Sequence, residues 1–306
     1  MIGETKLVNF DHTYIAIRRR SVLEIMDLSL HVIREYLAPL SILWLVGVLP
    51  FAIINWYLIG WLGEDYFDGS SLMLYFYLML LLIMIQAQVA TLPITIFLGK
   101  SMFDESPGIM ETLWAALKCN PYMYWVHGIL RLIIPTMLLT LVINPSTGDD
   151  GIAAAAVWLT IFVLLGMIIR VSRPFASEIL CLEKTPALRK KEGQITYAIR
   201  SLSLHRAASG EVFGRAFVLF FLVIPLTFTI LGALLSIDAL LNLSTDYETL
   251  PVVYYGPIAA WIAAGIMAVV RFLNYIDIRI RQEGWEVELR LRAEAMRMQQ
   301  AGGTAS

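Results

Sequence analysis

Apolar residues are concentrated in six long runs along the chain, separated by short polar or charged segments. The runs cover residues 37–62, 71–99, 122–144, 151–171, 212–240 and 252–273. Each run reaches or exceeds the ~20 residues that a helix needs to cross the hydrocarbon core of a bilayer. The pattern predicts an all-α membrane protein with six transmembrane helices. Composition agrees, because only 16% of the residues are charged, against about 25% in an average soluble domain.

An internal repeat is indicated by what precedes the first, third and fifth runs. Their first halves end alike, in "LVGVLP" at Pro50, "RLIIP" at Pro135 and "FLVIP" at Pro225. An amphipathic stretch comes before each: "EIMDLSLHVIRE", "GIMETLWAALK" and "QITYAIRSLSLH". Such stretches are typical of helices that lie in the membrane interface. The chain is therefore predicted to contain three parallel two-span repeats, each opened by an interfacial elbow helix. Coincidence is the alternative, since prolines are common in membrane helices.

Every second loop between the apolar runs lacks positively charged residues. The segments "GEDYFDGSS", "NPSTGDD" and "STDYETLP" contain no Lys or Arg. By the positive-inside rule both termini then face the cytoplasm, which for a bacterial chain means an inner-membrane protein. The predicted parts are a cytoplasmic N-terminal segment with an interfacial helix (1–36), a six-span membrane domain (37–275) and a cytoplasmic C-terminal helix with a disordered tail (276–306).

Both ends of the chain are similar to one known family. "RRRSVLEIMDLSLHVIREYLAPL" and "FLNYIDIRIRQEGWEVELRLR" resemble bacterial proteins with the glycerophosphoryl diester phosphodiesterase membrane domain. The resemblance implies spans interleaved with interfacial helices, and many members without an enzymatic domain. The phosphodiesterase activity belongs to a separate barrel of roughly 250 residues, for which this chain has no room. We therefore expect no enzymatic activity.

Four polar residues form the candidate intramembrane site. His127 and Arg131 lie four apart in the third run, so on a helix they share one face. Gln86 and Gln88 lie deep in the second run. Interhelical hydrogen bonding is the usual role of such glutamines. We expect Arg131 to face the protein interior or a water-filled cleft unless its span is strongly tilted, in which case it snorkels to the interface.

Small residues recur every fourth position in the sixth run, at Gly256, Ala260, Ala264 and Ala268. This spacing predicts a face on which another helix packs closely. Cys119 and Cys181 have neither metal-ligand nor redox spacing and are expected to be small apolar filler. The motifs of cofactor sites, catalytic sites and nucleic-acid-binding modules are not found, so no cofactor, metal or nucleic acid is expected.

The pattern favours a non-enzymatic scaffold or accessory subunit. Its basic cytoplasmic face would bind membrane lipids or partner proteins, because Lys and Arg near the surface attract anionic headgroups. The alternative is a transporter or channel for a small anionic or lipid-like substrate, using the polar cluster of His127, Arg131, Gln86 and Gln88. The sequence names no substrate, partner or oligomeric state.

Overall fold

Every element of the computed structural model is an α-helix within the part of the chain that it describes. That part comprises residues 20–64, 69–102, 107–119, 157–158, 160–161, 164, 175–183, 196–206, 209–242 and 249–303. The helices are α1 (Val22–Glu35), α2 (Leu37–Glu64), α3 (Gly69–Ala90), α4 (Leu92–Ser101), α5 (Ile109–Leu117), α9 (Ala176–Cys181), α10 (Tyr197–Arg206), α11 (Ser209–Asn242) and α12 (Thr249–Gly303).

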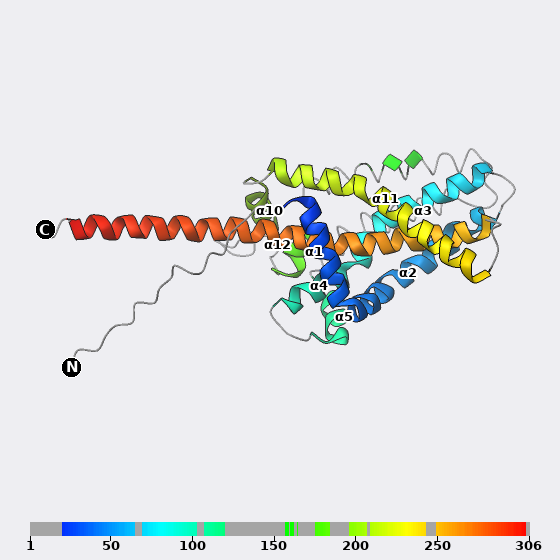
Figure 1. Cartoon of the computed structure of the whole chain (residues 1–306), viewed down its shortest axis with the longest axis horizontal. Coiled ribbons are helices and arrows are strands. Elements are labelled where there is room, and N and C mark those ends of the chain that lie inside the picture. The colour runs from blue at the N-terminus through cyan, green and yellow to red at the C-terminus, as the bar shows by residue number, and fades with distance from the viewer. Residues whose placement is uncertain are drawn as a thin grey trace.

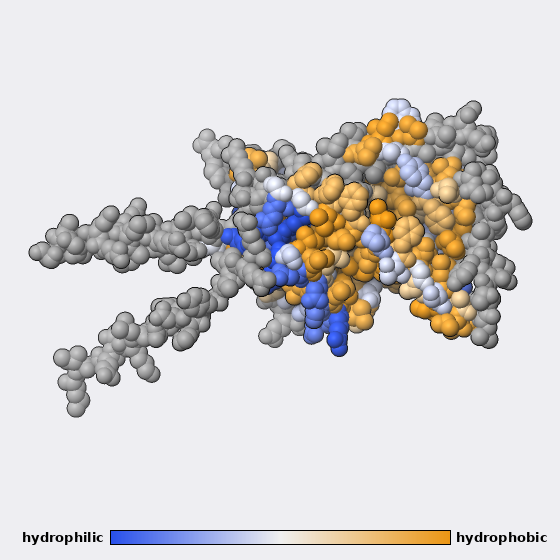
Figure 2. Space-filling model, turned by 45° about the horizontal axis from the view of Figure 1, so that its top comes forward, coloured by the Kyte–Doolittle hydropathy of each residue, from blue (hydrophilic) through white to orange (hydrophobic). Residues whose placement is uncertain are grey.

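Four stretches are long and apolar enough to cross a membrane: Leu37–Leu62, Leu72–Ser101, Gly210–Leu241 and Val252–Arg281. They match the first, second, fifth and sixth predicted runs, so this is a membrane protein with several spans. The third run, and all but five helical residues of the fourth, lie outside the described residues. Figure 2 agrees, because apolar side chains dominate the described surface and hydrophilic ones gather at one end of the bundle.

The three predicted elbow segments are helical, as α1, α5 and α10. In α1 a capping box starts the helix: Ser21 accepts from the Glu24 backbone N–H, and the Glu24 side chain accepts from the Ser21 N–H. Ile25 and Ser29 face the bundle, whereas Leu23 and Leu30 are exposed. Exposed apolar side chains on an amphipathic helix suit the membrane interface.

Helix α12 is the centre of the bundle. It contacts α11, α3, α1 and α4, and in Figure 1 it lies between α11 and α2. In the most apolar 18-residue stretch of its span, 61% of the residues are buried. In the corresponding stretch of α11, none is buried. Two apolar clusters join α12 to its neighbours, one through Tyr75 and Trp261 and one through Leu43 and Phe272. Because lipid is as apolar as these side chains, close packing rather than escape from water holds the helices together.

Three features differ from the sequence-based predictions. The second span is broken at Thr91, between α3 and α4, whereas Pro50 and Pro225 lie inside continuous helices. Helix α12 runs without a break through residues 275–276, the predicted boundary, and continues to Gly303. Cys119 and Cys181 form a disulfide with a Cα–Cα distance of 5.5 Å.

Candidate functional site

The predicted polar site is only partly described. The Gln86 amide exchanges two hydrogen bonds with Asn55 of α2, at 2.7 and 2.6 Å, and both side chains are buried. Gln88 is also buried, while His127 and Arg131 lie outside the described residues. Since the Gln86 amide is paired with another amide, it holds α3 to α2 and does not line an open path.

The small-residue stripe of α12 is a packing face. A Cβ on Gly256 would lie 2.5 Å from the Phe76 ring of α3, so a side chain there would require that ring to shift. Ala260 and Ala268 are buried, and Ala264 packs against the same cluster as Ala260. Small side chains at these positions allow two helix backbones to approach closely.

A group of charged side chains surrounds α12 at the hydrophilic end of the bundle. We call it the charged collar, and it consists of Glu178, Glu183, Arg200, Glu211, Arg215, Arg271, Asp277, Arg279 and Arg281. The C-terminal motif that carries the family resemblance supplies Asp277, Arg279 and Arg281. Their partners are Arg215 and Glu211 of α11 and Glu183, which follows α9.

The deepest pair of the collar joins α12 to α9. Arg271 Nε lies 2.8 Å from Glu178 Oε1, and the two side chains are 11% and 0% exposed. Arg271 also donates to the Thr95 hydroxyl of α4, and Ser177 donates to the other Glu178 oxygen. Three helices distant in sequence therefore meet at one buried ion pair.

A second group in the collar is centred on Glu183. Arg200 of α10 binds both of its oxygens, at 2.7 and 3.0 Å. Tyr275 of α12 donates to the same carboxylate at 2.6 Å, and Arg279 lies 3.8 Å from it. A bidentate guanidinium is the strongest arrangement for such a pair, so α10 is held firmly against α12.

A third group ties α11 to α12. Arg215 contacts Asp277 at 2.9 Å and Glu211 at 2.6 Å. It also donates to the Asn274 side chain and to the Arg20 backbone carbonyl. Arg281 then binds both oxygens of Glu211. The N-terminal end of α1 is thereby fixed to the centre of the bundle.

The collar links α12 to the helices around it through paired charges. Each of its charged groups has a partner within the collar. The described residues also contain no group of three His, Cys, Asp or Glu arranged to hold a metal. Breaking a buried pair leaves one uncompensated charge, which costs about 3–5 kcal/mol. The collar therefore fixes the direction of α12.

An apolar cavity of about 400 Å³ lies on another side of the bundle, where the second span is broken. We call it the α5 cavity. Pro93 has no N–H to donate to the Val89 carbonyl, and the helix bends there. The Ala90 carbonyl oxygen at the bend comes so close to Gly47 of α2 that no Cβ would fit. The floor of the cavity is formed by Val46, Gly47, Val89, Leu92 and Pro93.

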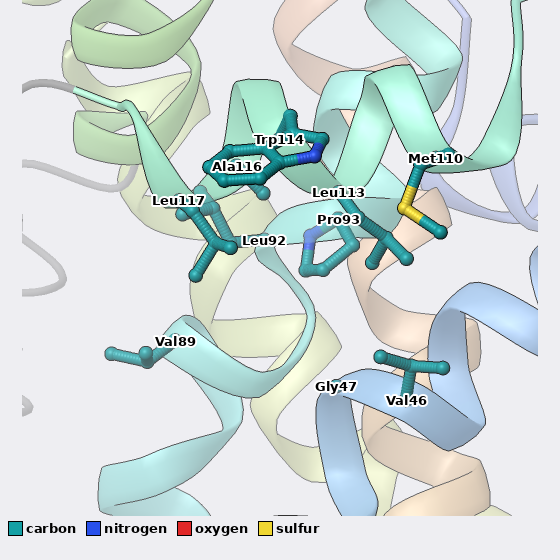
Figure 3. Close-up of a pocket in the computed structure, with 10 residues that line it drawn as sticks. All are labelled: Val46, Gly47, Val89, Leu92, Pro93, Met110, Leu113, Trp114, Ala116 and Leu117. Atoms are coloured by element: carbon teal, nitrogen blue, oxygen red, sulfur yellow. The ribbon is translucent and has the colours of Figure 1, made fainter.

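Helix α5 forms the roof of this cavity. The side chains of Met110 and Leu113 point from α5 across the space toward Val46, as Figure 3 shows. The roof is completed by Trp114, Ala116 and Leu117. All ten lining residues are apolar, and the volume is within the ~300–1,000 Å³ of ligand pockets.

The roof is attached at both of its ends. Near its start, Glu111 forms an ion pair with Lys100 at the end of α4. Just after its end, the disulfide joins Cys119 to Cys181 of α9. The cavity is therefore bounded by a helix fixed in place by bonds outside the cavity itself.

The sequence pattern did not predict the collar or the cavity.

Comparisons find no matching family model, no matching curated protein and no matching solved structure. Function must therefore be argued from the geometry alone.

Proposed function

We propose that this chain is a non-enzymatic membrane protein that acts as a scaffold or accessory subunit. The observation that carries the proposal is the course of α12. This helix is the central span, it is fixed by the charged collar, and it continues unbroken beyond the bundle (Figure 1). At 1.5 Å per residue, residues 282–303 extend it by about 33 Å. A long helix rooted in a rigid bundle suits the binding of partner proteins at a fixed distance from the bilayer.

Lipid binding is the second part of the proposal. Arginines and lysines of the described part gather at one end of the spans, among them Lys100, Arg200, Arg215 and Arg281. We propose that this end faces the cytoplasm of a bacterial inner membrane, with both termini on that side. Anionic lipid headgroups would be attracted to it.

We further propose six spans in three parallel repeats, as the sequence pattern predicts. Support comes from α1 and α10, which precede the spans of α2 and α11 in the same order. Helix α5 has the equivalent position before the third run. Membership of the glycerophosphoryl diester phosphodiesterase membrane domain family also stays a proposal, resting on the two terminal motifs.

The transporter alternative has one observation in its favour. The second span is broken at Thr91, and broken helices are common at the substrate sites of transporters. Against it, the Gln86 amide is paired with Asn55. Flux of a small anion or a labelled lipid through proteoliposomes would support the transporter, and the absence of flux at high protein density would support the scaffold.

Truncation tests the scaffold directly. We would compare the full chain with one lacking residues 285–306, and use a chain lacking only residues 304–306 as the control. After cross-linking in cells, a partner should co-purify in a fixed ratio with the full chain and the control, and be lost with the long truncation. Unchanged thermal stability of the bundle would show that the loss is local. An identical set of bound proteins in all three samples would contradict the proposal.

A further inference from the structure

We propose that the α5 cavity binds one acyl chain of an anionic phospholipid, and that Lys118 binds the phosphate of the same lipid. The inference rests on the lipid-binding part of the proposed function. It does not depend on partner binding by α12.

The position of the cavity favours a lipid chain over a soluble ligand. Met110, Trp114 and Leu117 line the cavity and are also 67%, 56% and 69% exposed. Apolar side chains exposed to this extent on an interfacial helix face the bilayer. With these side chains in the bilayer, the space beneath them would open toward the acyl chains, so a hydrocarbon chain is the occupant that matches its apolar lining.

Pre-organisation also favours a binding site over a packing defect. The Ala90 carbonyl against Gly47 fixes the floor, and the Lys100–Glu111 ion pair fixes the roof. An unsupported roof helix would settle onto the floor and bring its side chains into contact. A site that is already open loses less conformational freedom on binding.

The headgroup contact is given by Lys118, the residue that follows α5. Its ammonium lies 5.4 Å from the ring centroid of Trp114. The cation is therefore held at the mouth of the cavity, next to a side chain that lines it. Cation–π contact occupies one side of the ammonium and leaves N–H groups for a phosphate. Trp and Lys at the membrane interface are suited to headgroup depth, and the positive charge favours a net anionic lipid.

Filling the cavity tests the acyl-chain site. Val89→Phe places a ring in the cavity, and Val218→Phe on the exposed face of α11 is the matched control. Each protein would be purified in mild detergent from nanodiscs of equal phosphatidylglycerol and phosphatidylcholine, and its retained lipid measured by mass spectrometry. We expect wild type and Val218→Phe to retain phosphatidylglycerol and Val89→Phe to lose it. Equal retention by all three would overturn the proposal.

Removing the cation tests the headgroup contact. Lys118→Ala should lower the preference for phosphatidylglycerol over phosphatidylcholine about fivefold, as expected for one basic side chain at the surface. Arg34→Ala removes one exposed charge at the end of α1 and is the control. An unchanged preference in Lys118→Ala would refute the assignment of Lys118.

A third measurement does not depend on how Val89→Phe folds. Phosphatidylglycerol with brominated chains should quench wild-type tryptophan fluorescence more than that of Trp114→Phe. Equal quenching would place the bound chain elsewhere and overturn the site. Partner capture by the full chain would still support the scaffold in that case. Failure of the full chain to capture any partner, with lipid retention intact, would refute the scaffold alone.

Discussion

Glu178 and Arg271 form an ion pair between α9 and α12, with 2.8 Å between Oε1 and Nε and little access to water. Glu178→Gln should lower the free energy of unfolding by about 3–5 kcal/mol, because it leaves the arginine charge buried and uncompensated. Thermal unfolding in detergent measures the loss. Glu111→Gln breaks an exposed pair instead and should cost less than about 1 kcal/mol. Equal stability of the two variants would show that the buried pair stabilises the fold no more than an exposed one.

The same pair allows a second comparison. Replacing both partners, as in Glu178→Gln with Arg271→Met, removes the uncompensated charge. The double variant should recover part of the lost stability. A double variant less stable than Glu178→Gln alone would show that the arginine is stabilised by something other than Glu178.

Gly47 is expected to be intolerant of a side chain. Its Cα faces the Ala90 carbonyl at the bend of the second span, so Gly47→Ala would push α2 away and cost roughly 1–3 kcal/mol. Gly232 of α11 has open space where a Cβ would be placed, and Gly232→Ala should be neutral or stabilise the helix by up to about 1 kcal/mol. The melting temperatures of the two variants test this prediction. A similar change in both would contradict the close approach of the Ala90 carbonyl to Gly47.

The amide pair of Asn55 and Gln86 should show coupling in a double-mutant cycle. Gln86→Leu leaves the Asn55 amide buried without this partner and should cost about 1–2 kcal/mol. The variant with leucine at both positions should be more stable than the sum of the single changes predicts. Additive effects would mean that each amide is satisfied independently of the other.

The disulfide predicts a response to reductant. Closing a loop between positions 62 residues apart stabilises a fold by on the order of 4 kcal/mol in the chain-entropy model. Oxidised protein should therefore melt at a higher temperature than protein treated with dithiothreitol, whereas a Cys119→Ser, Cys181→Ser variant should not respond. Alkylation followed by intact mass measurement would report the thiol state. Free thiols in protein purified under oxidising conditions would contradict the bond.

The sequence predicted the elements that depend on local pattern. Long apolar runs predicted the four described spans, and amphipathic spacing predicted α1, α5 and α10. The break at Thr91 had a signal, since Pro93 lies in the middle of the second run and removes a helical hydrogen bond. Pro50, Pro135 and Pro225 recur at the same point of three other runs. Recurrence indicated a repeat, and it did not indicate which helix bends.

The candidate site depends on tertiary contacts and was harder to predict. Glu178 and Arg271 are 93 positions apart, and nothing local to either one indicates the other. The same holds for Cys119 and Cys181, whose spacing resembles no known motif. Gln86 was identified from its depth in an apolar run, but Asn55 was not, because a single asparagine in the first run has no periodic pattern. The cavity follows from the bend and from the attachment of α5, so no single residue predicts it.

The central claim is that α12 is a rigid helix that presents a binding surface to a partner protein outside the membrane. Photo-cross-linking in living cells tests it most directly, with the reactive amino acid placed at successive positions from residue 285 to residue 301. Leu240, an exposed residue of α11, is the control position. The account predicts one discrete adduct that recurs every three to four positions, as expected for one face of a helix, and no such adduct at Leu240. Adducts of equal yield at every position, or none above the control, would contradict it.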